Sequence, residues 1–197
     1  MKIGILRTGH SPDGMIEALG DYDEMFVRLL DGHGFTFQTF SVMDGEFPSG
    51  PQDADGWLIT GSKHGAYEDH AWIPPLEELI RDINITGKPM IGVCFGHQII
   101  AQALGGKVEK FAGGWSVGRT EYTMDGRTVA LNAWHQDQVT RLPEFGPDFI
   151  DGLIRTRGKG VVPDDQLAAA SAKLSEPLDS SDIATEMAQF FKSKARA

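Results

Sequence analysis

The chain has 197 residues and a net charge of -10, from 18 Lys and Arg against 28 Asp and Glu. Its length predicts a single domain over residues 1–197, large enough to bury a substantial core. The acidic balance argues against a nucleic-acid or membrane-surface partner, and no apolar run approaches membrane-spanning length. The N-terminal apolar run ends at Arg7 and is too short for a secretory signal, and a lone cysteine suits a reducing compartment. We therefore expect a cytoplasmic protein.

The first half of the chain alternates strand and helix patterns. A continuous apolar run over Lys2–Arg7 predicts a strand buried on both faces, and Thr8–Gly20 reads as a loop of Gly, Ser, Pro and Asp. Asp21 is expected to cap a helix that ends at Gly32 or Gly34. Further strands are predicted over Thr36–Val42, Gly56–Thr60 and Met90–Val93, with a helix over Ile73–Ile85.

The rhythm changes after a helix that begins beyond Cys94. Glycine-containing turns separate three segments that read as mostly antiparallel strands, Lys107–Phe111, Val117–Met124 and Thr128–Ala133. No strand is predicted from Pro143 onward. Apolar residues at helical spacing predict helices over Pro147–Thr156 and Asp165–Leu174, and a last helix capped by Ser180 or Ser181. The predicted fold class is α/β, with a mostly parallel sheet flanked by helices, a small antiparallel addition and a helical C-terminus.

Cys94 lies between Gly92 and Gly96, after a predicted strand and before a predicted helix. Gly-x-Cys-x-Gly at such a junction is the thiol version of the nucleophile elbow, in which two glycines permit a very tight turn. The N-terminal amides of the following helix favour thiolate over thiol. The alternative is an ordinary buried cysteine on a core strand. The two glycines favour the elbow.

The segment Cys94–Gln98 resembles the C-x-G-x-Q signature of the class I glutamine amidotransferases. From Ile3 to about Leu142 the chain is similar to small stand-alone members related to the glutaminase domain of GMP synthase. The resemblance implies a flavodoxin-like sheet and a Cys–His–Glu triad that hydrolyses the side-chain amide of glutamine. No cofactor and no metal site is predicted.

Cys94 is the predicted nucleophile. One oxyanion donor should be the backbone amide of Phe95, which follows it, and the other should come from Gly61 after the third strand. Gln98 lies one helical turn beyond Cys94, and the resemblance implies that it helps to bind glutamine. The segment from His135 to Val139 resembles the H-x-D-x-V sequence that the family carries beside its active site. The predicted substrate-binding residues are Gln98, Ser62, Gln136 and Asp137.

The catalytic histidine of the family has no counterpart here. In the family a late H-P-E motif supplies the His and its Glu, and the nearest match is Leu142-Pro143-Glu144, with leucine in place of histidine. The sequence is best explained by an internal deletion that removed late strands near 142–144. Glu144 and, as a surrogate base, His135 are then the remaining triad candidates. His64, His70 and His97 are expected at the surface, away from the thiol.

The leading hypothesis is a glutamine amidotransferase-like enzyme that hydrolyses glutamine through a thioester on Cys94. Because no P-loop is present, transfer of the ammonia would need a separate synthetase or acceptor protein. A γ-glutamyl peptide hydrolase is the nearest enzymatic alternative. The missing histidine also supports a catalytically silent relative that binds a ligand or partner.

Overall fold

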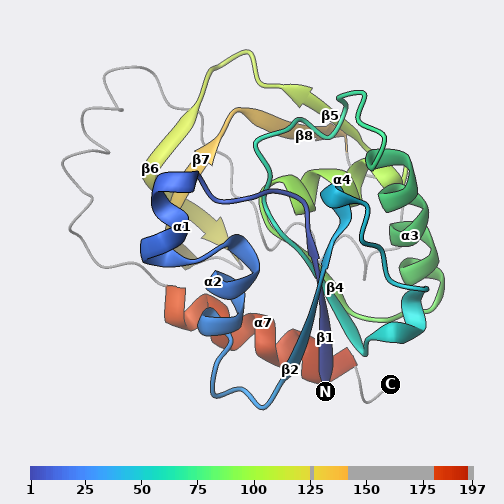
Figure 1. Cartoon of the computed structure of the whole chain (residues 1–197). Helices are drawn as coiled ribbons and strands as arrows, with labels where there is room; N and C mark the ends of the chain where they lie inside the picture. Colours follow the sequence, from blue (N-terminus) through green and yellow to red (C-terminus); the bar gives the residue numbers. More distant parts are fainter. Residues whose placement is uncertain (125–126, 142–179, 195–197) are drawn as a thin grey trace.

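The computed structural model of the protein describes residues 1–124, 127–141 and 180–194 (Figure 1). The predicted helices over 147–156 and 165–174 lie outside these residues, as does Glu144. Within them the chain forms a parallel sheet between two sets of helices, with two antiparallel strand pairs beyond it. The predicted α/β class is confirmed.

The central sheet has four parallel strands in the order β2-β1-β3-β4. Their bounds are Lys2–Arg7 for β1, Thr36–Ser41 for β2, Gly56–Ile59 for β3 and Met90–Gly92 for β4. In register, Ile5 of β1 lies between Thr39 of β2 and Leu58 of β3. All four predicted strands are present. Because they run parallel, the segments that follow β3 and β4 leave the sheet at the same edge.

Five helices are described: α1 over Asp13–Leu19, α2 over Tyr22–Leu29, α3 over Ile73–Ile85, α4 over Phe95–Ala103 and α7 over Ser180–Lys194. Two short 3-10 turns, Val42–Asp44 and Pro51–Asp53, follow β2 and precede β3. Asp21 caps α2 as predicted, accepting from the Tyr22 amide and forming a capping box with Glu24. None of these helices is long and apolar enough to cross a bilayer.

The prediction of a loop over Thr8–Gly20 is wrong in part, because α1 lies within it. Pro12 precedes this helix, Asp13 stands in its first turn, and Gly20 ends it with φ of 76°. These are ordinary helix start and stop residues. The helix buries no residue. It therefore carries no apolar stripe of the kind by which helices are found in a sequence.

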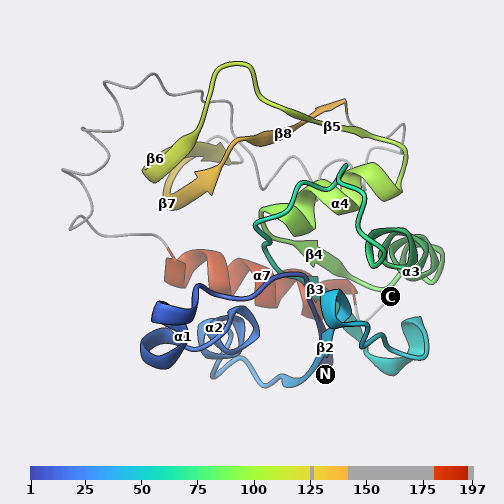
Figure 2. The same cartoon turned by 45° about the horizontal axis from the view of Figure 1, so that its top comes forward.

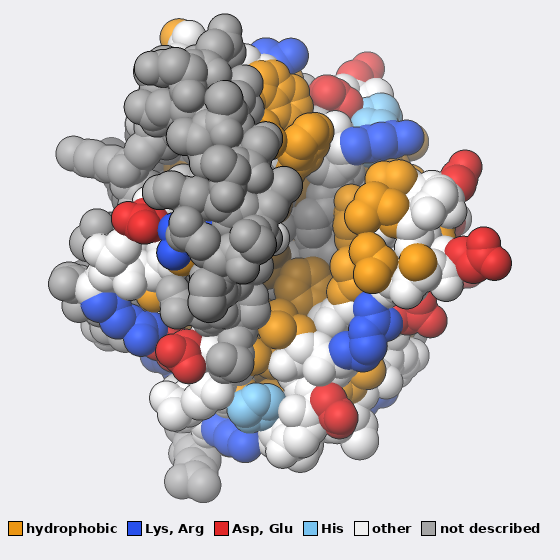
Figure 3. Space-filling model, turned by 90° about the vertical axis from the view of Figure 1, so that its left-hand side faces the viewer, with side chains coloured by type: hydrophobic (Ala, Val, Ile, Leu, Met, Phe, Trp, Pro, Cys, Tyr) orange, Lys and Arg blue, Asp and Glu red, His pale blue; other side chains and the backbone are white. Residues whose placement is uncertain are grey.

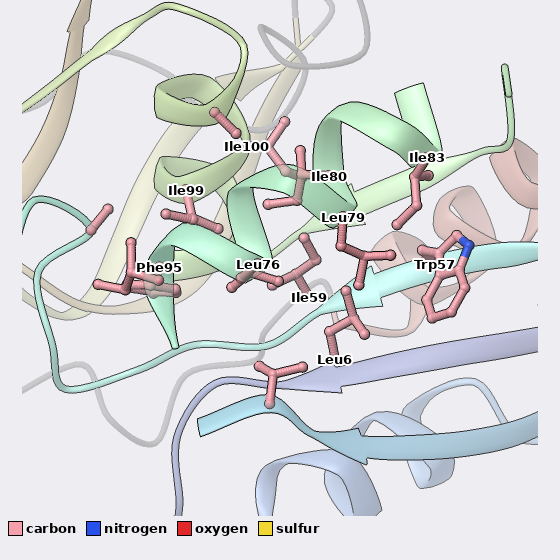
Figure 4. Close-up of a cluster of buried hydrophobic side chains, with 14 of the residues drawn as sticks. Leu6, Trp57, Ile59, Leu76, Leu79, Ile80, Ile83, Phe95, Ile99 and Ile100 are labelled. Carbon is pink, nitrogen blue, oxygen red and sulfur yellow. The ribbon is translucent and has the colours of Figure 1, made fainter. Parts of the chain in front are cut away.

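Alternate residues of the central strands pack against different helices. Leu6, Trp57 and Ile59 belong to a core cluster with α3 and α4 (Figure 4). Ile5 and Leu58 belong to a second cluster with α2 and α7. Strand side chains alternate between the two faces, so each face of the sheet is covered by its own helical layer, as Figure 2 shows.

Four strands follow α4, namely β5 over Lys107–Lys110, β6 over Ser116–Met124, β7 over Arg127–His135 and β8 over Asp137–Arg141. They form two antiparallel pairs, β5 with β8 and β6 with β7. The predicted antiparallel addition is confirmed. No strand was predicted over residues 137–141, because this segment is short and has no run of apolar residues.

Several large hydrophobic side chains of the described residues remain exposed. They include Met15 and Leu19 on α1, and Trp115 and Trp134 at the β6–β7 pair. Trp134 is 73% exposed, and its ring centroid lies 6.1 Å from that of Trp115. Figure 3 shows hydrophobic side chains gathering around a hollow on the face that carries α1, β6 and β7.

Candidate active site

Cys94 lies at the bend between β4 and α4. Its backbone has φ of 54° and ψ of -110°, and it is the only non-glycine residue of the described part of the chain with a positive φ. A non-glycine residue held in so sparsely populated a region costs on the order of 1–3 kcal/mol. Such a conformation persists only where the surrounding structure enforces it. The thiol is half-buried rather than packed into the core.

The two glycines that flank Cys94 permit this bend. A side-chain carbon added to Gly96 would overlap the backbone carbonyl of Ile59, and one added to Gly92 would overlap the backbone of Gly96. The Gly96 amide donates to the carbonyls of Thr60 at 3.1 Å and Val93 at 3.0 Å. Helix α4 therefore begins in direct backbone contact with the end of β3.

Gly61 lies beside Cys94. A side-chain carbon built on Gly61 would stand 3.7 Å from Cys94 Cβ. Thr8 holds this turn from the end of β1, because its hydroxyl donates to the carbonyl of Thr60 at 2.9 Å. The hydroxyl also lies 3.2 Å from the carbonyl of Gly61. The structure thus brings together Gly61, Cys94 and Phe95, the three residues that the sequence assigned to attack and to oxyanion binding.

Tyr22 is a residue near the thiol that the sequence analysis missed. Burial is the main cause that raises the pKa of Tyr22. The negative charges of Cys94 and, to a smaller extent, Asp21 raise this pKa further. Its ring also approaches Gly9, where an added side-chain carbon would stand 3.4 Å from Tyr22 Cε2 and 3.0 Å from the Gly61 carbonyl. The only available signal was its position directly after the helix cap that follows the first strand.

Gln98 is buried in α4, where its side chain holds the H-x-D segment. Its Nε2 donates to the backbone carbonyl of Asp137 at 2.9 Å. The carboxylate of Asp137 in turn accepts from the hydroxyl of Tyr67 at 3.1 Å. Burial raises the pKa of Tyr67, and this hydrogen bond raises it further. The start of β8 is thus tied to α4 and to the loop after β3.

The other predicted residues make contacts of their own. Ser62 Oγ accepts from the backbone amide of His64 at 3.2 Å. His135, the predicted surrogate base, ends β7, and its Nε2 lies 3.4 Å from the Tyr122 hydroxyl. The Gln136 side chain reaches the carbonyl of Phe111 at 3.5 Å.

One expectation about the histidines needs correction. His97 was expected on a helix surface, but it is only 4% exposed, in a helix that β5 and β8 contact. His64 and His70, which were expected to face solvent, have side chains that are 22% and 33% exposed, and both contact Glu68.

A cluster of charged side chains lies at the C-terminal end of β1. His10 Nδ1 lies 2.6 Å from Asp21, and its Nε2 lies 3.2 Å from Asp44. The hydrogen bond with Asp21 raises the pKa of His10. Burial would raise the pKa of Asp21, but hydrogen bonds from His10 and two backbone amides lower it. Arg7 joins the cluster through Asp21 at 3.2 Å and Asp23 at 3.1 Å.

Comparison with known families decides what this arrangement belongs to. The model of the family described as glutamine amidotransferase class I matches residues 41–148, more than half of the chain. The chain belongs to the class I glutamine amidotransferase family. The matched interval contains Gly61, Cys94 and the H-x-D segment. It confirms the resemblance that the C-x-G-x-Q sequence indicated.

Two curated relatives illustrate the range of this amidotransferase family. The chain is 36% identical over 141 residues to gamma-glutamyl peptidase 4 of Arabidopsis thaliana, covering 64% of the chain and 56% of that protein. It is 35% identical over 137 residues to the glutamine-hydrolyzing GMP synthase of a Synechococcus strain, covering 63% of the chain and 25% of that protein. The chain thus spans little more than half of the length of the plant relative.

Solved structures of the same family support the fold. A glutamine amidotransferase from Thermotoga maritima matches all of the chain and 99% of its own length, with a TM-score of 0.66 at 16% identity. One from Methylobacillus flagellatus matches all of the chain and 93% of its own length, with a TM-score of 0.63 at 15% identity. The sheet of this amidotransferase-family chain is flavodoxin-like, as predicted.

Proposed function

We propose that the chain cleaves γ-glutamyl amide bonds, with Cys94 as the nucleophile. The observation that carries the proposal is the strained left-handed backbone of Cys94 beside Gly61 and at the start of α4. A positive φ places the side chain of this residue away from the regular course of the chain, and the N-terminus of α4 stabilises a thiolate. The substrate class is glutamine or a γ-glutamyl compound, as the names of the relatives suggest.

The reaction proceeds in two steps. The Cys94 sulfur attacks the γ-carbonyl carbon, the carbonyl oxygen becomes an oxyanion, and the amide nitrogen leaves with one added proton as ammonia or an amine. Backbone amides of Phe95 and Gly61 bind the oxyanion, which is the role that preorganised donors play in acyl transfer. Water then hydrolyses the γ-glutamyl thioester, which releases a carboxylate and restores the thiol.

Proton transfer is the weak step of this site. Leu142 stands where the family motif has its histidine, and the sequence has no histidine beyond His135. A positioned acid–base group contributes about 10²–10⁴-fold to such a reaction. We therefore expect thioester formation on Cys94 with slow turnover, with water or the imidazole of His135 carrying the proton.

The test measures the reactivity of the Cys94 thiol separately from the turnover of substrate. A glutamine analogue bearing an alkylating group should label the protein once, at Cys94, as read by mass spectrometry of the intact chain. Cys94→Ala should abolish the label, whereas Ser193→Ala, a change at the exposed end of α7, should not. Ammonia release from glutamine and amine release from a γ-glutamyl peptide then show which substrate turns over. Failure of the analogue to label Cys94 would overturn the proposal.

Leu142 in place of histidine also favours a second function, a silent relative that binds a γ-glutamyl compound without cleaving it. In that case Cys94→Ala should leave glutamine binding by calorimetry unchanged, and neither substrate should be consumed. Either function leaves room for a separate acceptor or partner protein. A thiolate nucleophile needs a reducing compartment, so we place the protein in the cytoplasm, to be checked by cell fractionation.

A further inference from the structure

Three side chains of the loop between β3 and α3 converge on one point. His64 Nδ1 lies 3.3 Å from Glu68 Oε2, and His70 Nε2 lies 2.9 Å from the same oxygen. The donor atoms of His64, Glu68 and His70 all lie within 4.8 Å of one another. Two imidazole nitrogens thus face one carboxylate oxygen.

We propose that His64, Glu68 and His70 bind one Zn²⁺ ion. Two imidazoles and one carboxylate with an open fourth position form a donor set that zinc adopts in proteins. Bonds of 2.0–2.2 Å in a tetrahedron put neighbouring donor atoms about 3.3–3.6 Å apart. The distance from His64 to Glu68 is 3.3 Å, and the distance of 2.9 Å from His70 to Glu68 would have to widen by a few tenths of an ångström. No metal site was predicted from the sequence, because these residues fit no metal-binding motif.

The loop presents the three donors on a fixed frame. Gln102 of α4 donates to the backbone carbonyl of Ala66 at 2.6 Å, and Tyr67 donates to Asp137. The Glu68 amide donates to the carbonyl of Gly65 at 3.0 Å, which closes a turn within the loop. The ligands are therefore held before an ion arrives, and less ordering entropy opposes binding.

The aromatic ring of Trp72 contacts both imidazoles. The rings of His64 and His70 lie 4.2 Å apart, and the His70 ring is stacked on Trp72 at 5.9 Å. Trp72 in turn contacts Phe95, the residue after Cys94, at 5.5 Å. The site thus adjoins the elbow without including its thiol.

The exposure of the cluster also suits a cation. The side chain of Glu68 is 44% exposed, and those of the histidines are 22% and 33% exposed. An ion can enter from solvent and retain water as its fourth ligand.

The test uses the full chain and Co²⁺, which substitutes for Zn²⁺ and absorbs visible light when four-coordinate. One equivalent of Co²⁺ should bind, show no thiolate-to-cobalt charge-transfer band, and be displaced by Zn²⁺. Cys94→Ser should leave this binding unchanged. Mg²⁺ and Ca²⁺ should not compete, because they prefer oxygen ligands.

Variants identify the ligands. His70→Gln and Glu68→Gln should each weaken Co²⁺ binding at least about tenfold, since loss of a ligand costs no less than the 10–100-fold cost of losing its hydrogen-bond partner. His33→Gln, in the turn before β2, is the matched control and should bind like the wild type. Circular dichroism should be the same for all four proteins. Equal affinity across the variants, or a thiolate band abolished by Cys94→Ser, would overturn the site.

Discussion

At the scale of single residues, the elbow depends on the absence of two side chains. Cys94 adopts its left-handed backbone because Gly96 lets α4 begin against the carbonyl of Ile59. Strain of this kind is retained where it positions a side chain. The glycines therefore specify the thiol's position as directly as the cysteine does.

Gly96→Ala should lower the free energy of unfolding by about 1–3 kcal/mol, the usual cost of forcing extra volume into a packed site. It should also reduce alkylation of Cys94 by the glutamine analogue, since the bend must shift. Gly14→Ala is the control, because Gly14 lies in α1 and an added carbon there meets nothing within 4 Å. Urea unfolding measures the stability of the two variants. A Gly96→Ala protein as stable as the Gly14→Ala protein would contradict the described bend.

The cluster at the end of β1 should make stability depend on pH. The pKa of His10 is raised from 6.5, so its contribution is fully present below pH 6.5 and is lost as the pH rises through its folded pKa. The pKa of Asp21 is lowered from 3.8, so its contribution is lost as the pH falls below that value. Asp44 and Arg7 also face the imidazole and share in the effect.

We expect wild type to exceed His10→Gln in unfolding free energy by under about 1 kcal/mol, since the imidazole is partly exposed. The difference should be largest between pH 4 and 6.5 and should decline above that range, as measured by urea unfolding at each pH. His33→Gln controls for the removal of a histidine outside the cluster. A difference that grows with rising pH would contradict the assignment.

At the scale of elements, α7 completes the second core cluster. Phe191 is fully buried against Gly56 and Phe35, although more than one hundred residues separate it from both. Arg127 of β7 forms an ion pair with Glu186 of α7. The last described helix therefore closes the face of the sheet that α2 alone leaves uncovered.

Phe191→Ala should lower the free energy of unfolding by about 3–5 kcal/mol, the cost of removing a fully buried phenylalanine. Phe190→Ala, one position earlier and partly exposed, should cost clearly less. Urea unfolding of the full chain compares the two. Equal losses would show that α7 does not dock in this orientation.

The elements that a sequence can reveal are those that bury a regular pattern. Helix α3 matches its predicted bounds because five of its residues face the core at helical spacing and glycine and proline follow it. Helix α1 buries nothing, and β8 has no run of apolar residues, so neither left such a pattern. Tyr22 was missed because its neighbours Gly9 and Cys94 come from chain segments that only the fold brings together.

At the scale of the whole molecule, the predicted nucleophile and one predicted oxyanion donor lie at the same edge of the sheet. Gly61 and Cys94 were predictable as a pair because parallel neighbouring strands end at the same edge. The position of the family's last motif is not described, because residues 142–179 lie outside the described part of the chain. The role of Glu144 therefore remains a prediction.

Leu142→His should not raise ammonia release from glutamine above the wild-type rate. The sequence between Trp134 and Leu142 leaves no room for the further strands that position the family's histidine, so the new imidazole would lack its support. Glutamine turnover with coupled detection of ammonia measures this. A rise of about 10²-fold or more, within the range of a positioned acid–base group, would show that the imidazole reaches the thiol unaided.

The four tryptophans lie in very different surroundings, which makes the protein its own optical reporter. Trp57 is fully buried and donates to the carbonyl of Pro51 at 3.3 Å, whereas Trp134 is 73% exposed and Trp115 is 47% exposed. Iodide in solution should therefore quench the emission of the β6–β7 pair while that of Trp57 stays shielded. Loss of the shielded fraction would report opening of the central sheet, separately from any movement of the outer strands.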